Sequence, residues 1–375
     1  MKALPYGISD FPRVMREDYY YVDKTRFIEM LERQPPYLFL IRPRRFGKSL
    51  FLAMLEAYYS IDYADRFKEL FGELYIGQHP TKRHNSYMVL RFNFSAISSK
   101  LEDVERSFSE YCCMVMKNFI LKYEHLMGSD VWKVVNPDET NPRQMLSALK
   151  EYVSRTDCPR IYLLIDEYDN FTNTILSSYG QERYREKTHG EGFIRGFFNN
   201  IKDSTSNADA AVERLFITGV SPITMDDVTS GFNIGTNIST LPEFNSVIGF
   251  SMEEMREMVS YYKSESALPA DMTVDGLIET MKPWYDNYCF SSWNLDEKVF
   301  NSDMALYFLN SYLLRKRAPE MMIDSNIRTD YNKLRHLVQI DKRFGANASV
   351  IQQIIAEGSI TAQIATSFPA EKMTD

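Results

Sequence analysis

The feature that most constrains this chain is the triplet Gly47-Lys48-Ser49, which lies between two segments of different periodicity. Before it, Tyr37–Ile41 is an uninterrupted apolar run, which predicts a short buried strand. After it, apolar residues recur at helical spacing over Leu50–Tyr59, which predicts an amphipathic helix. A strand, a glycine turn and a helix start together form the context in which backbone N–H groups bind phosphate. The triplet therefore predicts a phosphate-binding loop.

Each part of this loop has a chemical role in that interpretation. Lys48 reaches the β- and γ-phosphate oxygens of a nucleotide, and Ser49 ligates Mg²⁺. The position five residues before Gly47, where a standard loop has glycine, is Arg42. A basic turn that only caps the helix therefore remains an alternative. The residues predicted to contact the nucleotide are Arg44, Arg45, Phe46, Gly47, Lys48, Ser49 and Leu50.

Three arginines, Arg42, Arg44 and Arg45, flank the loop. Guanidinium groups bind phosphate oxygens with two parallel hydrogen bonds and can offset transition-state charge. The alternative is that they form salt bridges to nearby acids and fix a loop that lacks its first glycine. Arg45 is the arginine that we expect to contact phosphate, and we count it with Lys48 among the catalytic candidates.

A pair of carboxylates provides the second half of the predicted site. The apolar run Arg160–Ile165 predicts a buried strand, and Asp166-Glu167 follows it directly. Asp166 is placed to hold Mg²⁺, and Glu167 is placed to orient and deprotonate the attacking water. The alternative is that the two acids only start a loop or cap the next turn. A basic loop and an acid pair, each after a strand, together favour a nucleotide site.

The identity of the nucleotide follows from a motif that the chain lacks. No Asn-Lys-x-Asp string for guanine recognition occurs, because Asn332-Lys333-Leu334-Arg335 lacks the acid. ATP is therefore favoured. Thr218 ends a further short apolar run, Leu215–Thr218, and its hydroxyl is a candidate sensor of the γ-phosphate. The equal alternative is that Thr218 is a β-branched residue that fills a strand.

The order of predicted elements indicates an α/β fold with a parallel sheet. Further strands are predicted at Met88–Phe94 and Leu215–Thr218, and they alternate with helices at Val104–Leu121 and Met145–Val153. Loops are predicted over residues 128–143, 180–192 and 202–210. From Ser251 the pattern becomes helical, and the expected helices are Met252–Tyr262, Val274–Met281, Met304–Arg315, Tyr331–Val338 and Ser349–Glu357. We expect an ATPase core over 1–250, a helical lid over 251–330 and a helical C-terminal segment over 331–375.

Composition narrows the class of protein. The net charge of −8 argues against a general polyanion-coating protein, although a local basic groove is compatible with it. No apolar run approaches the ~20 residues of a membrane helix, and the N-terminus has no apolar signal core, which predicts a cytoplasmic protein. The four cysteines show no metal spacing and are expected to be free thiols. Asp23 or Thr25, before a predicted helix at Arg26–Leu31, is expected to be a helix N-cap.

Several strings together resemble the bacterial AAA-ATPase-like family of P-loop ATPases. They are Gly7-Ile8-Ser9-Asp10-Phe11, Tyr21-Val22-Asp23-Lys24-Thr25, Arg42-Pro43-Arg44-Arg45-Phe46-Gly47-Lys48-Ser49-Leu50, Leu164-Ile165-Asp166-Glu167-Tyr168-Asp169, Thr218-Gly219-Val220-Ser221-Pro222-Ile223 and Trp284-Tyr285-Asp286-Asn287-Tyr288. The resemblance covers essentially the whole chain, and the arginine at position 42 is similar to the family pattern. Asn287, in place of the usual glycine, and Asn301-Ser302, in place of a frequent Asn-Pro, depart from that pattern.

The resemblance implies a P-loop core with a helical lid that is winged-helix-like in related ATPases. Family members commonly continue into a PD-(D/E)XK nuclease-like domain; none is recognisable here, so we expect either a piece of a longer protein or a stand-alone ATPase. The expected activity is Mg²⁺-dependent ATP hydrolysis that drives a conformational switch. The alternatives are a nucleotide-gated binding module with little hydrolysis and a small-molecule kinase. The macromolecular partner is open, with DNA as a candidate, and so is the oligomeric state.

Overall fold

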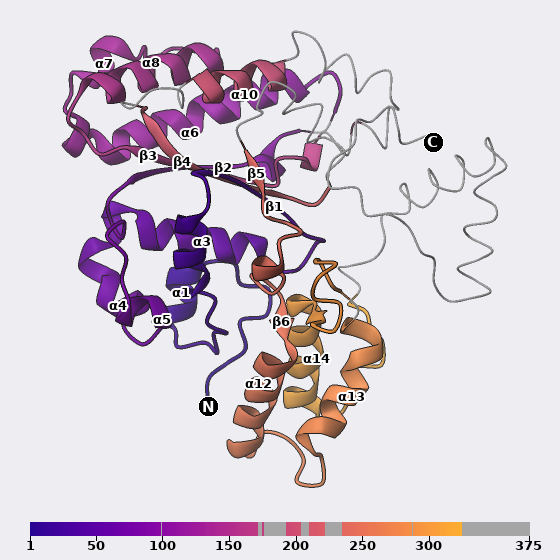
Figure 1. The fold of residues 1–375 in the computed structure, drawn as a ribbon. Coiled ribbons are helices and arrows are strands. Elements are labelled where there is room, and N and C mark those ends of the chain that lie inside the picture. Colours follow the sequence, from indigo (N-terminus) through magenta and orange to yellow (C-terminus); the bar gives the residue numbers. More distant parts are fainter. Residues whose placement is uncertain are drawn as a thin grey trace, which may run out of the picture.

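The centre of the protein is a five-stranded parallel sheet in the order β2-β3-β4-β1-β5 (Figure 1). The computed structural model describes residues 1–98, 100–171, 175, 193–203, 210–221, 235–286 and 288–324. The strands of the sheet are β1 (Tyr37–Ile41), β2 (Met88–Asn93), β3 (Ile161–Asp166), β4 (Val212–Gly219) and β5 (Thr236–Asn237). The predicted α/β fold with a parallel sheet is therefore confirmed.

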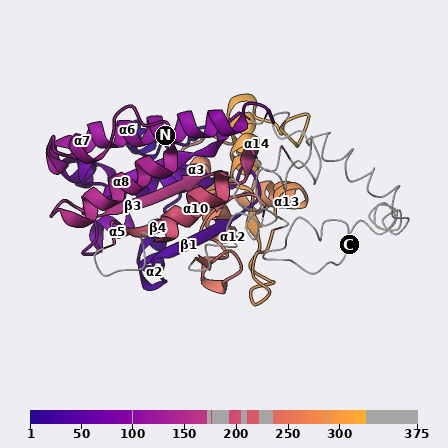
Figure 2. The same ribbon diagram turned by 90° about the horizontal axis from the view of Figure 1, so that it is seen from above.

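Helices cover both faces of this sheet, as a parallel sheet requires (Figures 1 and 2). One face carries α6 (Val104–Met127), α7 (Val131–Val134), α8 (Pro142–Arg155) and α10 (Phe193–Asp203). The other carries α1 (Phe11–Arg16), α2 (Phe27–Arg33), α3 (Lys48–Tyr59), α4 (Phe67–Phe71) and α5 (Tyr75–Gln78). The connection between β1 and β2 therefore runs on the α3 face, and the described helices that follow β2 and β3 lie on the α6 face.

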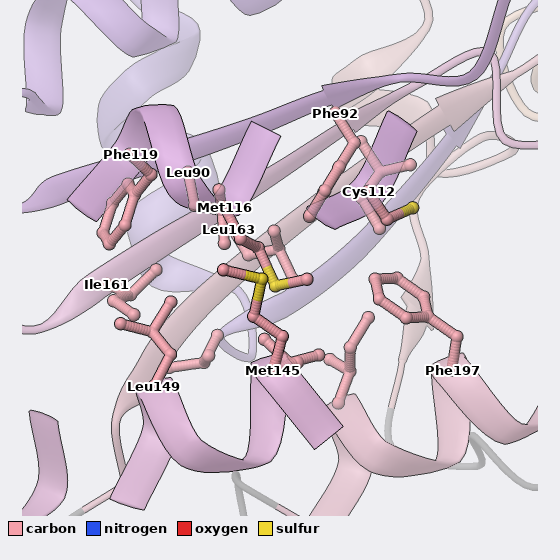
Figure 3. Close-up of a cluster of buried hydrophobic side chains, with 14 of the residues drawn as sticks. Leu90, Phe92, Cys112, Met116, Phe119, Met145, Leu149, Ile161, Leu163 and Phe197 are labelled. Carbon is pink, nitrogen blue, oxygen red and sulfur yellow. The ribbon is translucent and has the colours of Figure 1, made fainter. Parts of the chain in front are cut away.

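The alternation of side chains along the strands separates two hydrophobic cores. In β3, Ile161 and Leu163 face α6, α8 and α10, whereas Tyr162 and Leu164 face α3. Figure 3 shows the first core, in which Met116 of α6 and Met145 of α8 meet beside the sheet. Because Asp166 has the same parity as Leu164, the strand directs its carboxylate to the α3 side.

A third hydrophobic cluster belongs to what we call the helical unit. Its elements are β6 (Phe250–Ser251), α12 (Met252–Ser264), α13 (Val274–Tyr285), β7 (Val299–Phe300) and α14 (Ser302–Arg315). A capping box between Ser251 and Glu254 starts α12. Residues 1–9 and 20–24, which we call the N-terminal strap, pack Leu4, Tyr20 and Val22 against this unit. The strap therefore joins the first residues of the chain to its last described helices.

The structure corrects several predicted boundaries. The predicted loop 128–143 contains α7 and the start of α8, and α6 continues to Met127. The predicted loop 202–210 begins too early, because α10 extends to Asp203. The sequence analysis missed α10, although Phe197 and Ile201 on it are fully buried. The predicted loop 180–192 and the helices Tyr331–Val338 and Ser349–Glu357 lie outside the described residues. In the described chain, no helix is both long and apolar enough to cross a bilayer.

Candidate functional site

The candidate site lies at the carboxyl edge of the sheet, where the parallel strands all end. Ile41, the last residue of β1, pairs with Gly219 of β4, and Asp166 ends the neighbouring strand β3. Because β4 lies between β1 and β3, the loop after β1 and the acid after β3 are separated by two strand spacings, roughly 10 Å. The fold therefore brings the two predicted halves of the site to one edge with a gap between them.

The loop after β1 makes a tight turn into α3. Gly47 has a φ of +88°, which a residue without a Cβ adopts readily, and α3 begins at the next residue, Lys48. The Lys48 side chain is buried, and its Nζ donates to the carbonyl oxygens of Arg42 at 3.1 Å and Pro43 at 2.8 Å. Burial lowers the pKa of Lys48 to about 8, against the opposing attraction of Asp169, Asp166 and Glu167. The ammonium thus lies inside its own loop.

Arg42, at the position of the missing glycine, is a structural residue. Its side chain is 1% exposed and donates to the carbonyl oxygens of Ile41 at 2.9 Å, Ser239 at 2.6 Å and Phe244 at 2.8 Å. The guanidinium also lies over the Phe290 ring, 4.0 Å from its centroid. The loop is therefore anchored through backbone carbonyls and an aromatic ring, not through the salt bridges to acids that we considered for Arg42.

The exposed part of the loop contacts α14. Arg45 has a left-handed φ of 70°, and its carbonyl accepts hydrogen bonds from the Asp303 N–H at 3.2 Å and Ser302 Oγ at 3.3 Å. Its guanidinium lies 3.4 Å from Asp303 Oδ2. Asn301, the N-cap of α14, donates from Nδ2 to the Arg44 carbonyl at 3.3 Å. The loop thus caps the N-terminus of α14, and a phosphate contact by Arg45 stays a prediction.

The two predicted carboxylates have different surroundings. Asp166 is fully buried, and neither carboxylate oxygen has a hydrogen-bond donor among the described residues. Glu167 has a left-handed φ of 51°, which turns the chain sharply at the end of β3. Burial raises the pKa of Glu167, the Asp166 charge raises it further, and Lys48 and Arg44 oppose this shift. The two adjacent acids therefore point into different environments.

The other predicted contact residues occupy distinct positions. The Thr218 side chain is buried, and its hydroxyl donates to the Leu40 carbonyl at 2.8 Å, so in this structure it bridges β4 and β1. Phe46 is buried against Tyr288 and Phe290, with edge-to-face rings 4.8 and 5.4 Å apart. Ser49 and Leu50, in the first turn of α3, line a cavity in front of the loop.

This cavity has a volume of about 360 Å³ and connects three parts of the fold. The loop and Glu167 contribute polar and charged groups to its lining. The N-terminal strap and the segment before α12 contribute mainly apolar side chains, and α14 closes the remaining side. These further lining residues include Ile8, Tyr20, Tyr21, Val22, Lys24, Ile248, Phe250, Ser302, Asp303 and Leu306. A lining that combines polar and apolar side chains suits a ligand with both polar and apolar parts.

The predicted helix cap at Asp23 or Thr25 is wrong. Helix α2 begins at Phe27 and has no side-chain cap. Instead, Asp23 Oδ2 accepts from the Tyr75 N–H at 2.8 Å, and Thr25 Oγ1 accepts from the Ile76 N–H at 3.2 Å, so both residues cap the distant helix α5. Both residue types do cap a helix, as their propensity predicts, but the helix is α5 and not the neighbouring α2.

Sequence reasoning assigned no site role to three groups that the structure places beside the loop. Arg91 was discoverable as a charged residue inside the apolar strand β2. Asp169 is buried and accepts from the Val220 N–H at 3.1 Å and the Ser221 N–H at 2.6 Å, which ties the end of β3 to the end of β4. The third group is Asn301, the N-cap of α14. The sequence around Asn301 indicates a helix start, but it does not indicate that this start contacts the loop at Arg44.

Comparison with known proteins identifies the family. A family model described as "Predicted AAA-ATPase" matches residues 5–229, more than half of the chain, and the chain belongs to this family. An uncharacterized protein in the vnfD 5′ region of Azotobacter chroococcum mcd 1 is 28% identical over 341 residues, which cover 86% of this chain and 56% of that protein. The chain thus spans about half the length of this curated relative. The Walker-type ATPase of Pyrococcus abyssi aligns with a TM-score of 0.43 and 12% identity, covering 94% of this chain and 79% of that one.

Proposed function

We propose that the chain binds ATP with Mg²⁺ at the carboxyl edge of the sheet and hydrolyses it. One observation carries the proposal, and it concerns two groups of the same site. Among the described residues, the buried Lys48 donates only to neutral carbonyls, and the buried Asp166 has no hydrogen-bond donor and only the more distant Arg91, at 3.8 Å, as an ion-pair partner. A buried charge is stable only with a compensating partner. A triphosphate with a divalent cation supplies negative charge for Lys48 and positive charge for Asp166.

The triphosphate would lie along the loop. Lys48 would exchange its loop carbonyls for phosphate oxygens, and the N–H groups that begin α3 would donate to the same oxygens, supported by the helix dipole. Arg45 would add a two-pronged contact if its guanidinium left Asp303. A sensing role for Thr218 requires its hydroxyl to exchange the Leu40 carbonyl for a phosphate oxygen. Apolar side chains of the cavity lining would contact the base.

The residues present fit a magnesium ion. Ser49 and Asp166 offer a hydroxyl and a carboxylate, which are the hard oxygen ligands that Mg²⁺ prefers, and both Asp166 oxygens lack donors among the described residues. When bound, the ion would neutralise charge on the phosphates. Glu167 would orient the attacking water and accept its proton. Its raised pKa makes the carboxylate a stronger base than an exposed glutamate.

The conformational switch in this proposal runs through α14. The carbonyl oxygens of Arg44 and Arg45 hold the first turn of α14, so a change in the loop on ATP binding would reach the helical unit directly. We keep the division into an ATPase core over 1–250, a helical lid over 251–330 and a C-terminal segment over 331–375 as part of the proposal. DNA is the candidate partner, and ATP turnover measured with and without duplex DNA tests it.

The experiment that tests hydrolysis is Glu167→Gln, which keeps the shape of the side chain but cannot accept a proton. We expect ATP to bind with unchanged affinity and single-turnover hydrolysis to slow by about 10²–10⁴-fold. Asp166→Asn should instead weaken the Mg²⁺-dependent part of binding. Glu69→Gln, on the exposed surface of α4, is the matched control. Equal turnover in Glu167→Gln and the unmodified protein would favour a nucleotide-gated binding module over an ATPase.

A further inference from the structure

Arg91 on β2 lies near both groups that we assign to the metal site, Ser49 and Asp166. Its Nη1 lies 2.9 Å from Glu56 Oε2, and its Nη2 donates to the Ser49 carbonyl at 3.4 Å. The same Nη2 lies 3.8 Å from Asp166 Oδ2. One guanidinium therefore lies near the first turn of α3, the second half of α3 and the carboxylate that ends β3.

The charge of Asp166 makes this contact important. Asp166 is fully buried, whereas Arg91 keeps 24% of its side-chain surface exposed. Arg91 is the ion-pair partner that the described residues provide for Asp166, and Lys48 adds attraction over a longer distance. A separation of 3.8 Å is too long for a hydrogen bond, so Arg91 offsets the charge while the lone pairs of Asp166 stay available.

We propose that Arg91 is a positioning residue of the metal site, which compensates Asp166 when no cation is bound and fixes it relative to Ser49. The inference rests on the proposed function only in assigning Asp166 and Ser49 to a metal. The compensation itself concerns the protein without metal or nucleotide. It can therefore be tested even if ATP binding fails, and its failure would leave ATP binding untouched.

A double-mutant cycle with Arg91→Gln and Asp166→Asn tests the proposal, by thermal unfolding in EDTA without nucleotide. We expect Arg91→Gln to lower Tm by roughly 5 °C, because it leaves a buried carboxylate uncompensated. In the Asp166→Asn background the same change should lower Tm much less. The loss of the Glu56 contact occurs in both backgrounds and cancels. An equal loss in both backgrounds would overturn the proposal.

Magnesium chloride alone gives a second readout. Arg91→Gln leaves Glu56 and Asp166 without their shared cation, so Mg²⁺ should raise Tm of this variant more than that of the unmodified protein. The extra response should vanish in the Arg91→Gln/Asp166→Asn double variant. Arg66→Gln, which breaks an exposed ion pair with Glu69, is the control. An equal Mg²⁺ response in Arg91→Gln and the unmodified protein contradicts the proposal.

Arg91→Gln alone could fail to fold, and the double variant then decides. The proposal requires Asp166→Asn to rescue folding of Arg91→Gln, because it removes the charge that Arg91 offsets. A double variant that also fails to fold would show that Arg91 serves the fold through Glu56 and the Ser49 carbonyl, and would overturn the proposal.

Discussion

Lys24 of the N-terminal strap and Lys48 of the loop are buried in the wall of one cavity, yet their charges are compensated differently. Lys24 Nζ donates to both carboxylate oxygens of Glu254 at 2.7 Å and to the Ser246 carbonyl at 2.9 Å. Lys48 Nζ donates to two loop carbonyls, and no carboxylate in the described chain lies within ion-pair distance of it. Burial lowers the pKa of both lysines.

The difference in hydrogen-bond partners indicates a structural role for Lys24 and a ligand-binding role for Lys48. A buried lysine with its own carboxylate contributes to holding two segments together, here the strap and the start of α12. A buried lysine that donates only to carbonyls, as Lys48 does, keeps a positive charge that nearby acids attract, but no carboxylate of the described residues forms an ion pair with it. Two lysines with similar burial thus have different inferred roles, and the hydrogen-bond partner of each ammonium group distinguishes them.

The largest effect that we predict is the loss of stability when the Lys24 ion pair is removed, and it tests whether Lys24 has the structural role that the comparison gives it. Lys24→Met removes the cation but keeps the apolar stem, and it leaves Glu254, whose side chain is only 13% exposed, without its lysine. Removing one member of a buried pair typically costs about 3–5 kcal/mol, and we expect a loss of that size in the free energy of unfolding. Urea unfolding without nucleotide measures it. An unchanged unfolding midpoint would show that Lys24 is not a scaffold residue.

A smaller effect is expected at the ion pair between Arg45 of the loop and Asp303 of the helical unit. Asp303→Asn weakens a partly exposed ion pair with Arg45, which is worth about 0.2–1 kcal/mol. If Arg45 exchanges Asp303 for phosphate, the variant should bind ATP up to about fivefold more tightly, because the competing carboxylate is gone. Arg45→Lys, which loses the two-pronged contact, should slow turnover. Unchanged ATP affinity in Asp303→Asn together with unchanged turnover in Arg45→Lys would contradict this exchange.

The sequence predicted the local parts of the site well. The apolar run at Tyr37–Ile41, the glycine turn and the amphipathic α3 are determined by neighbouring residues, and β1 has the predicted bounds. The buried run before Asp166-Glu167 was predicted for the same reason. Local periodicity also predicted the helices of the helical unit. In the structure α12 starts at the predicted residue, Met252, and α14 starts two residues before the predicted Met304, and each has a side-chain cap.

The long-range parts could not be predicted from local patterns. Arg42 was weighed as a phosphate ligand or a salt-bridge residue, yet its partners include the Ser239 and Phe244 carbonyls, which are 197 and 202 residues away in sequence. Asp303, the partner of Arg45 on α14, is 258 residues away in sequence. A guanidinium fits phosphates, acids and carbonyls alike, so only the fold determines which of them it meets.

The central claim is that Lys48, whose direct partners are two loop carbonyls, is the cation of a phosphate site. A calorimetric titration of Lys48→Met with ATP and Mg²⁺ tests it most directly. The account predicts that the unmodified protein and the surface control Lys68→Met bind ATP, and that Lys48→Met folds stably but shows no binding heat. The stabilisation of about 2.7 kcal/mol expected at a ligand concentration 100 times Kd should likewise disappear in Lys48→Met. Equal ATP affinity in Lys48→Met and the unmodified protein would contradict the account.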